Sequence, residues 1–307
     1  MTFRLTFLGT SGAVPTPERN PTGIHVNRDG TEVLFDVGEG IQRQMMRFST
    51  GFGLDYVLIT HLHGDHFYGL PGLLETLAFT DRTRPLTVVC PARLVDRLER
   101  FVRVSVGETP FPLQVAGIEP GAVAIRSAAF EVRAVRVEHD ATAVGYALVE
   151  DDRPGRFDRE RAIELGVPEG PKFGQLHRGD PVELDDGTVV EPAQVVGPPR
   201  PGRSVVYTGD TRPSEGVVEA AAGAQLLIHD ATFGDDLEAR AAETAHSTAR
   251  QAGRVARDAG VDRLAMVHTS ARYAGARERL VAEASEVFDG EILLPDDGDE
   301  VDVDFPR

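Results

Sequence analysis

The hexapeptide HLHGDH at positions 61–66 limits the folds and functions open to this chain more than any other stretch. It follows an apolar segment that predicts a strand, Tyr56–Thr60, and precedes a helix-like segment, FYGLPGLLETL. Its imidazole and carboxylate groups cannot all face one ion from a regular strand, because successive side chains point to opposite faces. A loop at the end of a strand can instead direct one pair to one ion and the next pair to a neighbouring ion. Imidazole with carboxylate suits zinc, and manganese or iron less well, so the hexapeptide predicts a metal site.

Three further candidate ligands follow short apolar strands in the same way. His139 comes after VRAVRV, Asp210 after SVVYTG and His268 after LAMV. An α/β scaffold brings such residues into one cleft because the ends of its strands converge. The full set suffices for two ions if one carboxylate bridges them, and Asp210 is the natural bridge. We expect one ion to be held by His61, His63 and His139 and the other by Asp65, His66 and His268, at the spacing of ~3.5–4 Å that suits phosphoryl displacement.

The apolar pattern predicts alternating strands and helices. The predicted strands are Phe3–Leu8, Glu32–Phe35, Tyr56–Thr60, Leu86–Cys90, Val132–Val137, Val205–Thr208, Leu226–Ile228 and Leu264–Val267. The predicted helices are Gly40–Arg47, Pro71–Ala78, Ala92–Arg103, Ser214–Ala221, His246–Ala259 and Ala274–Val287, with Ser247 and Thr248 as a candidate N-cap pair. Strands precede helices in both halves of the chain. This order predicts an α/β fold with helices packed outside sheets.

Composition narrows the class of protein further. The chain has 307 residues of which 41% are hydrophobic, so it is not disordered as a whole. Its one cysteine excludes a disulfide framework and a thiolate zinc cluster. No apolar run reaches ~18 residues, and the first residues lack the long apolar region of a signal peptide. We therefore expect a soluble, cytoplasmic protein without a membrane partner.

The charge is strongly acidic, with 49 Asp and Glu against 32 Lys and Arg, for a formal net charge of −17. Only Lys172 is lysine, and the other cations are arginine. The acid excess favours a surface adapted to molar salt, although a GC-rich genome would also replace Lys by Arg. The charge argues against nucleic acid as a partner at low salt. In ~1 M salt, however, the Debye length is about 3 Å, and net charge loses most of its power to exclude RNA.

One segment, from about 147 to 202, differs in composition because Pro and Gly become frequent. Six basic residues lie between Glu150 and Asp180, together with eight acids. A solvated surface insertion would explain this composition. An arm that grips an anionic partner, stiffened by Pro and hinged by Gly, would explain it as well.

Several motifs together resemble a known family. HLHGDH matches the HxHxDH signature of the metallo-β-lactamase superfamily, whose members hydrolyse lactams, thioesters, lactones and phosphodiesters. The whole chain resembles the ribonuclease Z family of tRNA 3′-processing endonucleases through FLGTSGAVP near the start, FDVGEG at 35–40, TGDTRP at 208–213, IHDATF at 228–233, AHSTA at 245–249 and HTSAR at 268–272. The resemblance implies an αβ/βα four-layer sandwich. It also implies a single domain over 1–307 with an inserted flexible exosite arm at 148–198. GVPEGPKFG, which contains Lys172, resembles the arm that clamps the body of tRNA.

The resemblance also implies roles for individual residues. The implied zinc ligands are His61, His63, Asp65, His66, His139, Asp210 and His268. Asp65 would also be the base that assists the attacking water, and His246 the donor of a proton to the departing 3′ oxygen. His229 and Asp230 lie where the family usually has His-Glu.

Substrate contacts are expected from two loops and the arm. Arg19 and Asn20 lie in a loop that resembles the family's PxKxRN, with Pro17 at the Lys position. Ser270 and Arg272 follow His268, where a contact to phosphate and a purely structural role are both open, and Lys172 lies in the arm.

We therefore expect a zinc-dependent endoribonuclease with two zinc ions per subunit, from a halophilic archaeon. It would remove the 3′ trailer from precursor tRNA, leaving a 3′-hydroxyl on the tRNA and a 5′-phosphate on the trailer. The resemblance implies a homodimer. The alternatives are a phosphodiesterase or lactonase of this fold that acts on a small molecule, and an RNA-binding or scaffold protein with a structural metal.

Overall fold

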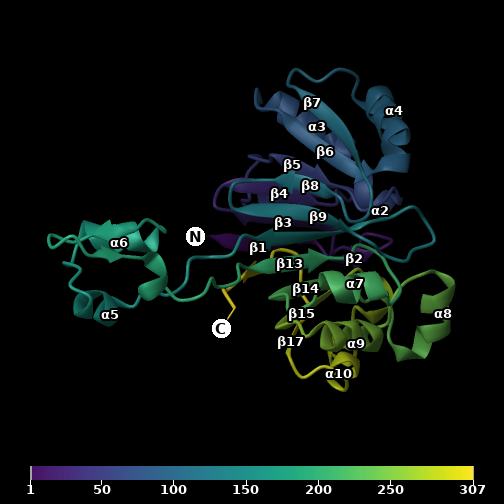
Figure 1. Ribbon diagram of the computed structural model, residues 1–307. Coiled ribbons are helices and arrows are strands. Elements are labelled where there is room, and N and C mark those ends of the chain that lie inside the picture. Colours follow the sequence, from purple (N-terminus) through teal and green to yellow (C-terminus); the bar gives the residue numbers. More distant parts are fainter. Residues whose placement is uncertain (1, 307) are drawn as a thin grey trace. The chain divides into compact units, whose positions relative to one another are not determined.

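A computed structural model describes residues 2–306, which form two compact units (Figure 1). Unit 1 comprises the chain up to Val149 and Ser204–Asp304, and unit 2 comprises Glu150–Arg203 with the chain end from Phe305. The insertion expected at 148–198 corresponds to unit 2, which ends a few residues later. The later end has a physical cause, because Arg203 donates hydrogen bonds to the Glu150 carboxylate at 2.7 and 2.8 Å, and this buried pair closes the base of the unit.

Unit 1 contains two seven-stranded sheets. The first has the order β18 (Glu300–Asp302), β1 (Phe3–Gly9), β3 (Gly23–Arg28), β4 (Thr31–Phe35), β5 (Tyr56–Leu58), β6 (Leu86–Pro91) and β7 (Leu113–Ile118). The second has the order β17 (Glu291–Leu293), β15 (Arg263–Val267), β14 (Leu226–Asp230), β13 (Ser204–Tyr207), β10 (Gly145–Glu150), β9 (Phe130–Val135) and β8 (Val123–Arg126). In each sheet four strands run parallel, β4 to β7 and β13, β14, β15 and β17.

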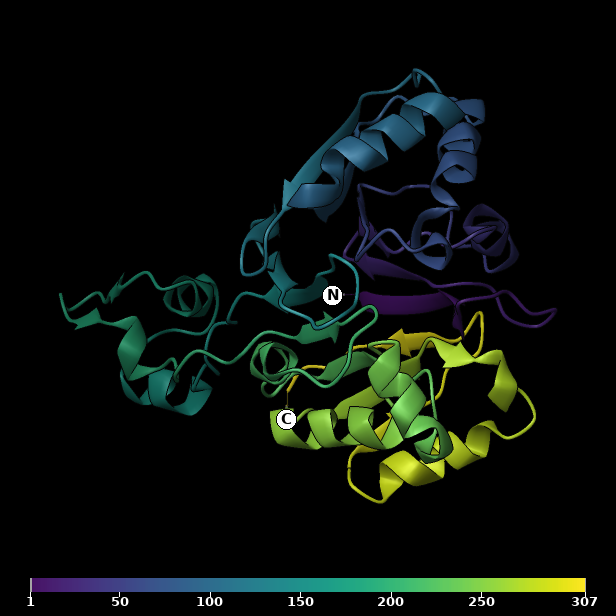
Figure 2. The same ribbon diagram turned by 90° about the vertical axis from the view of Figure 1, so that its right-hand side faces the viewer.

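Helices cover the outer face of each sheet. The first sheet packs against α1 (Ile41–Arg47), α3 (Leu70–Phe79) and α4 (Val95–Ser105), and the second against α7 (Glu215–Ala220), α9 (Ala249–Ala259) and α10 (Arg277–Ser285). A third apolar cluster, including Phe7, Phe35 and Tyr146, fills the space between the two sheets. Figure 2 shows the resulting order of helices, sheet, sheet and helices. The predicted αβ/βα four-layer sandwich is therefore confirmed.

Unit 2 has a small core of its own. It contains α5 (Arg159–Glu164), α6 (Pro171–His177) and a hairpin of β11 (Val182–Glu183) and β12 (Val189–Val190). Its buried side chains are Ala162, Val167, Leu176, Val182, Val190 and Val195. The Pro- and Gly-rich composition therefore does not mean an unstructured loop.

The predicted helices and strands agree with the structure except at several of their ends, and the structure contains further short helices and strands that were not predicted. All eight predicted strands and six predicted helices are present in whole or in part. The helix predicted to begin at His246 begins instead at Ala249, because the Thr248 hydroxyl accepts a hydrogen bond from Gln251 N and forms a capping box with Gln251. His246 thus lies in the preceding loop. No helix within residues 2–306 is both long and apolar enough to be a membrane span.

Candidate metal centre

The candidate ligands converge at the carboxyl ends of strands from both sheets of unit 1. His61 and His63 follow β5, and α2 (Gly64–Phe67) carries Asp65 and His66. His139 follows β9, Asp210 follows β13 and His268 follows β15. A short parallel pair, β2 (Ser11–Gly12) and β16 (Thr269–Ser270), ties the first loop of the chain to the turn after His268. The backbone approach is so close that a Cβ on Gly12 would lie 2.5 Å from the His268 carbonyl oxygen.

The seven side chains form one cluster around Asp210. Asp210 Oδ2 lies 3.2 Å from His66 Nε2 and 3.6 Å from His61 Nε2, and Asp210 Oδ1 lies 3.5 Å from His268 Nε2. Three sets of side chains have their ligand atoms within 4.8 Å of one another: His61, His63, His139 and Asp210; Asp65, His66 and His268; and Asp210 and His268 with Asp230 and His246. The structure thus brings together the same two groups that the sequence predicted, with Asp210 adjacent to both.

Four of the histidines are oriented through the nitrogen that faces away from the centre. His66 Nδ1 lies 2.7 Å from Asp36 Oδ2, and His61 Nδ1 lies 3.0 Å from the Thr60 hydroxyl. His139 Nδ1 donates to the Ala245 carbonyl at 3.1 Å, and His268 Nδ1 lies 2.7 Å from the Thr232 hydroxyl. Such partners fix the tautomer and the ring orientation of a metal-ligating histidine. In each case Nε2 is left facing the cluster.

Buried polar atoms that make no hydrogen bond indicate that the cluster fits a cation. His61 Nε2, His66 Nε2 and Asp210 Oδ1 are buried and accept or donate no hydrogen bond within residues 2–306. Such atoms are costly to bury unless something satisfies them, and a divalent ion does so for this donor set. Burial and the neighbouring His66 ring lower the pKa of His61, which favours the neutral imidazole that binds metal. Burial opposes the charged form of His66, but Asp210, Asp36 and Asp65 raise its pKa, and the field that attracts a proton there also attracts a metal ion.

His246 and Asp230 form a pair at the edge of the cluster. His246 Nδ1 donates to Asp230 Oδ2 at 2.8 Å, and its ring stacks at 5.1 Å on that of His268. Asp230 also accepts from Thr211 N, Thr232 N and the Thr232 hydroxyl, so its lone pairs are used within the protein and it is a poor candidate for a ligand. Burial opposes the imidazolium, but the Asp230 carboxylate offsets this and raises the pKa of His246 to about 9. His246 is therefore protonated at neutral pH, with Nε2 directed away from Asp230.

The expected substrate contacts lie in different surroundings. Arg19 is buried and donates hydrogen bonds to the Thr10 hydroxyl, the Thr10 carbonyl and the Thr269 hydroxyl. Its guanidinium group is thus used inside the protein, whereas the sequence led us to expect a contact with RNA. Asn20 Nδ2 donates to the Glu39 carbonyl at 2.8 Å. The bond to Thr269 holds the 15–20 loop against the turn after His268, and the bond from Asn20 holds it against the segment before α1.

The remaining candidate contacts are more accessible. Ser270 is half-buried and Arg272 is exposed, both within four residues of His268. Lys172 lies in unit 2, where its ammonium group donates to the Glu183 carbonyl at 2.9 Å.

The residues that orient the centre were not predicted as site residues. Asp36 belongs to FDVGEG and Thr232 to IHDATF, so both lie in recognised motifs, and their position just after a strand is the signal that could have found them. Tyr207 had no such signal; it ends β13, and its hydroxyl donates to Asp36 Oδ2 at 2.7 Å.

Two stacked sheets with outer helices and a His/Asp cluster at their strand ends define the metallo-β-lactamase superfamily. A family model described as a β-lactamase superfamily domain matches residues 31–157 and 182–269. Two relatives named ribonuclease Z match throughout. That of Halorubrum lacusprofundi is 58% identical over 100% of this chain and 99% of its own, and that of Natronomonas pharaonis is 56% identical with the same coverage. The crystal structure of the short form of human tRNase Z has a TM-score of 0.71 at 26% identity, covering 98% of this chain and 100% of that one.

This chain therefore belongs to the ribonuclease Z family, and it is a nuclease of the hydrolase class. The predicted family and enzyme class are confirmed.

Proposed function

We propose that the chain is a metal-dependent endoribonuclease that removes the 3′ trailer from precursor tRNA, leaving a 3′-hydroxyl on the tRNA and a 5′-phosphate on the trailer. The observation that carries the proposal is the cluster of seven His and Asp side chains with the Asp230–His246 pair at its edge. The full-length similarity to ribonuclease Z supports this function over a small-molecule phosphodiesterase or lactonase. A protein with a merely structural metal would not need a charged histidine beside it.

Two zinc ions per subunit suit the two ligand sets. His61, His63 and His139 would hold one, Asp65, His66 and His268 the other, and Asp210 would be shared. Such a pair of ions lowers the pKa of a water molecule and neutralises charge on phosphoryl oxygens. All seven ligands are nitrogen or oxygen donors of the kind that zinc accepts.

The protein's own groups would move the protons. Burial opposes ionisation of Asp65, but the nearby His66 and His268 lower its pKa, so the carboxylate is ionised at neutral pH. Its place beside the two ligand sets would let it orient the attacking water and take its proton. His246, protonated at neutral pH, would give a proton to the departing 3′ oxygen. A ribose alkoxide is a poor leaving group, and general acid help of this kind is worth about 10²–10⁴-fold.

Unit 2 would act as a clamp on the body of tRNA, and the active form would be a homodimer. The separate core of unit 2 supports the first point, because a folded module can present Lys172 and its arginines in fixed positions. Exposed apolar side chains on neighbouring helices, Met46 on α1 and Phe79 on α3, support a contact between subunits. A cytoplasmic location follows from the substrate, since precursor tRNA is made there.

Two substitutions test the assigned roles. Asp65→Ala should abolish cleavage of precursor tRNA, because it removes both a ligand and the proposed base. His246→Ala should slow the single-turnover step by about 10²–10⁴-fold while the metal content stays at that of the wild type. Near-normal turnover of the Asp65 variant would contradict the proposal, and loss of metal from the His246 variant would make His246 a ligand instead of an acid.

A further inference from the structure

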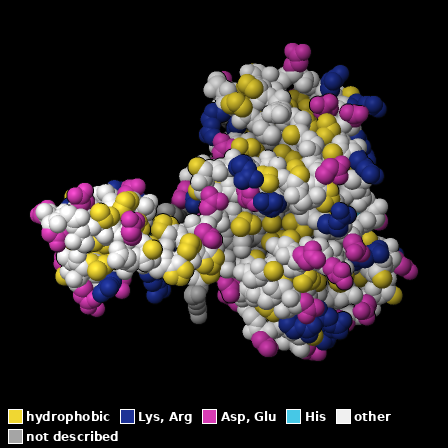
Figure 3. Space-filling view, in the orientation of Figure 1, with side chains coloured by type: hydrophobic (Ala, Val, Ile, Leu, Met, Phe, Trp, Pro, Cys, Tyr) yellow, Lys and Arg dark blue, Asp and Glu magenta, His cyan; other side chains and the backbone are white. Residues whose placement is uncertain are grey.

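Helix α4 carries a row of arginines without partners inside the protein. Arg93, in the turn before the helix, and Arg97, Arg100 and Arg103 within it are all exposed. Their guanidinium groups make no ion pair or hydrogen bond within the described part of the chain. Figure 3 shows basic groups at the edge of the molecule where Figure 1 places α4. In a chain with a net charge of −17, such a row is a local exception.

The row occupies the solvent side of the helix. Arg93, Arg97 and Arg100 are spaced by four and three residues, which places them on one face. Leu98 and Val102 are buried on the opposite face. The two acids of the helix, Asp96 and Glu99, lie on the flank away from Phe101, as follows from a turn of 3.6 residues. The side of the row that is free of acids is therefore the side of Phe101.

Phe101 lies between this row and the exposed ring of Tyr68, which is next to the metal centre. The centroid of the Phe101 ring lies 4.9 Å from that of Phe67 and 6.1 Å from that of Tyr68, and the planes of the Phe101 and Tyr68 rings are 28° apart. Tyr68 is 58% exposed, and its ring lies on Gly64, where a Cβ would come within 2.5 Å of it. Gly64 is the residue between His63 and Asp65. Tyr68 is thus a supported, accessible aromatic surface beside the candidate ligands.

We infer that Tyr68 and the arginines of α4 form a binding track for the single-stranded 3′ trailer, an inference that rests on the proposed function. A base of the trailer stacks on Tyr68, and its phosphates contact Arg97, Arg100 and Arg93. Stacking on an aromatic ring beside a basic surface is how proteins hold single-stranded RNA without reading its sequence. Stacking on Tyr68 involves no charge, so it persists at salt concentrations that weaken the contacts between arginine and phosphate.

The position of His246 identifies the strand on this side as the trailer. His246 lies at the edge of the cluster, with its ring against that of His268, and the proposed function places the 3′ oxygen of the mature tRNA beside it. His246 follows α8 (Glu238–Glu243), in the half of unit 1 that carries the second sheet, whereas α4 covers the first sheet. Figure 1 shows α2 between α4 and α8. RNA that leaves the centre over Tyr68 and α4 is therefore the other product, the trailer.

Two precursors with the same tRNA body and different trailers test the track. One has a single-nucleotide trailer and the other an unstructured trailer of about twelve nucleotides. The double variant R97Q/R100Q should raise KM about tenfold for the long trailer, from the loss of two phosphate contacts, and less than about twofold for the short one. R254Q/R257Q on α9 removes the same charge from another exposed surface and should leave both values unchanged. Equal effects of R97Q/R100Q on both precursors, or no effect on either, would overturn the inference.

Binding of the trailer alone separates this inference from the proposed function. A fluorescent single-stranded RNA of about twelve nucleotides should bind R97Q/R100Q and Tyr68→Ala about tenfold more weakly than the wild type, while Tyr68→Phe, which keeps the ring, binds normally. Equal binding by all of these proteins would refute the track. A wild type that binds this RNA through Tyr68 and α4 but cuts no precursor tRNA would instead refute the proposed function and leave the track standing.

Discussion

The carboxylate of Asp36 shows what single residues add to the centre. It accepts hydrogen bonds from Thr60 N, the Thr60 hydroxyl and the Tyr207 hydroxyl and lies 2.7 Å from His66 Nδ1. The ligands could be predicted because four of them lie in the HLHGDH hexapeptide and the other three, His139, Asp210 and His268, come one or two residues after a predicted strand. Asp36 could not be assigned to His66 in this way, because the two are 30 residues apart and only the packing of β4 beside β5 brings them together.

Asp36→Asn should weaken metal binding by about 10–100-fold, because His66 loses the partner that fixes its ring and raises its basicity. The measurement is the metal content of the purified variant after equilibration against graded chelator. Tyr207→Phe is the matched control, since it removes one hydrogen bond to the same carboxylate without changing its charge. Metal retention by Asp36→Asn equal to that of Tyr207→Phe and the wild type would show that Asp36 does not support the centre.

Asp230→Asn should move the alkaline limb of the pH profile of kcat to lower pH. Asp230 raises the pKa of His246, so the acid is protonated below that pKa and proton donation is lost as pH rises through it. Removing the carboxylate lowers the pKa and brings the loss to lower pH. Asp230→Glu keeps the charge and should leave the limb near its wild-type position. A limb that does not move in Asp230→Asn would rule out His246 as the group that titrates.

At the scale of elements, six of the helices and most inner strands of the two large sheets were predictable from the sequence, and several edge or short strands were not. In strands such as β15 the residues after the first are buried and apolar, so the sequence shows an apolar run. By contrast, β8, β17 and β18 are edge strands of three or four residues, too short and too exposed to show a pattern. The strand β3 was missed because its sequence, GIHVNR, contains polar residues that are nevertheless buried. One of them is His25, which lies beside Glu32 of the neighbouring strand β4.

Removal of unit 2 should weaken the binding of precursor tRNA without changing the chemical step at the metal centre. Replacing residues 151–202 by a short Gly-Ser linker should raise KM for precursor tRNA by about 10²-fold or more, because a second attachment point for the RNA is lost. Hydrolysis of a small phosphodiester, which touches only the centre, should change by less than about threefold. The buried Glu150–Arg203 pair stays in place to close the junction. Equal losses on both substrates would contradict the role of unit 2 as a clamp.

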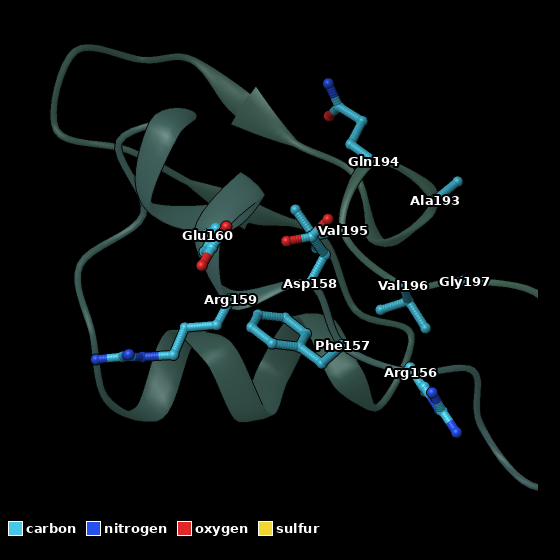
Figure 4. A pocket seen from close by; sticks show the side chains of 10 residues that line it. All are labelled: Arg156, Phe157, Asp158, Arg159, Glu160, Ala193, Gln194, Val195, Val196 and Gly197. Atoms are coloured by element: carbon cyan, nitrogen blue, oxygen red, sulfur yellow. The ribbon is translucent and has the colours of Figure 1, made fainter.

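At the scale of the whole molecule, the net charge of −17 reflects adaptation to a solvent of high salt concentration rather than the charge of the substrate. Acidic side chains are spread over the face shown in Figure 3, and the two relatives named above come from halophilic archaea. Arginines 156 and 159, with neighbouring acids, line a cavity of about 620 Å³ in unit 2 (Figure 4). Under the proposed function, affinity for RNA would rest on a few placed cations and on the metal centre.

Cleavage of precursor tRNA should therefore persist or rise between low and molar KCl. A basic RNA-binding enzyme loses affinity by about 10³–10⁵-fold over a much smaller range of salt, because counterions compete for the phosphates. The measurement is kcat/KM against KCl concentration, with circular dichroism recorded in parallel to separate folding from binding. A steep fall in kcat/KM while the protein remains folded would show that long-range attraction to RNA dominates after all.

The most direct test of the central claim maps the cut in a precursor tRNA to the nucleotide. The protein is incubated with the precursor in high KCl, with and without a chelator and with zinc added back. The account predicts one cut at the start of the trailer, a 3′-hydroxyl on the tRNA, a 5′-phosphate on the trailer, loss of cleavage with chelator and recovery with zinc. Cleavage that persists in chelator, or scattered cuts with a 2′,3′-cyclic phosphate on the tRNA side, would contradict it.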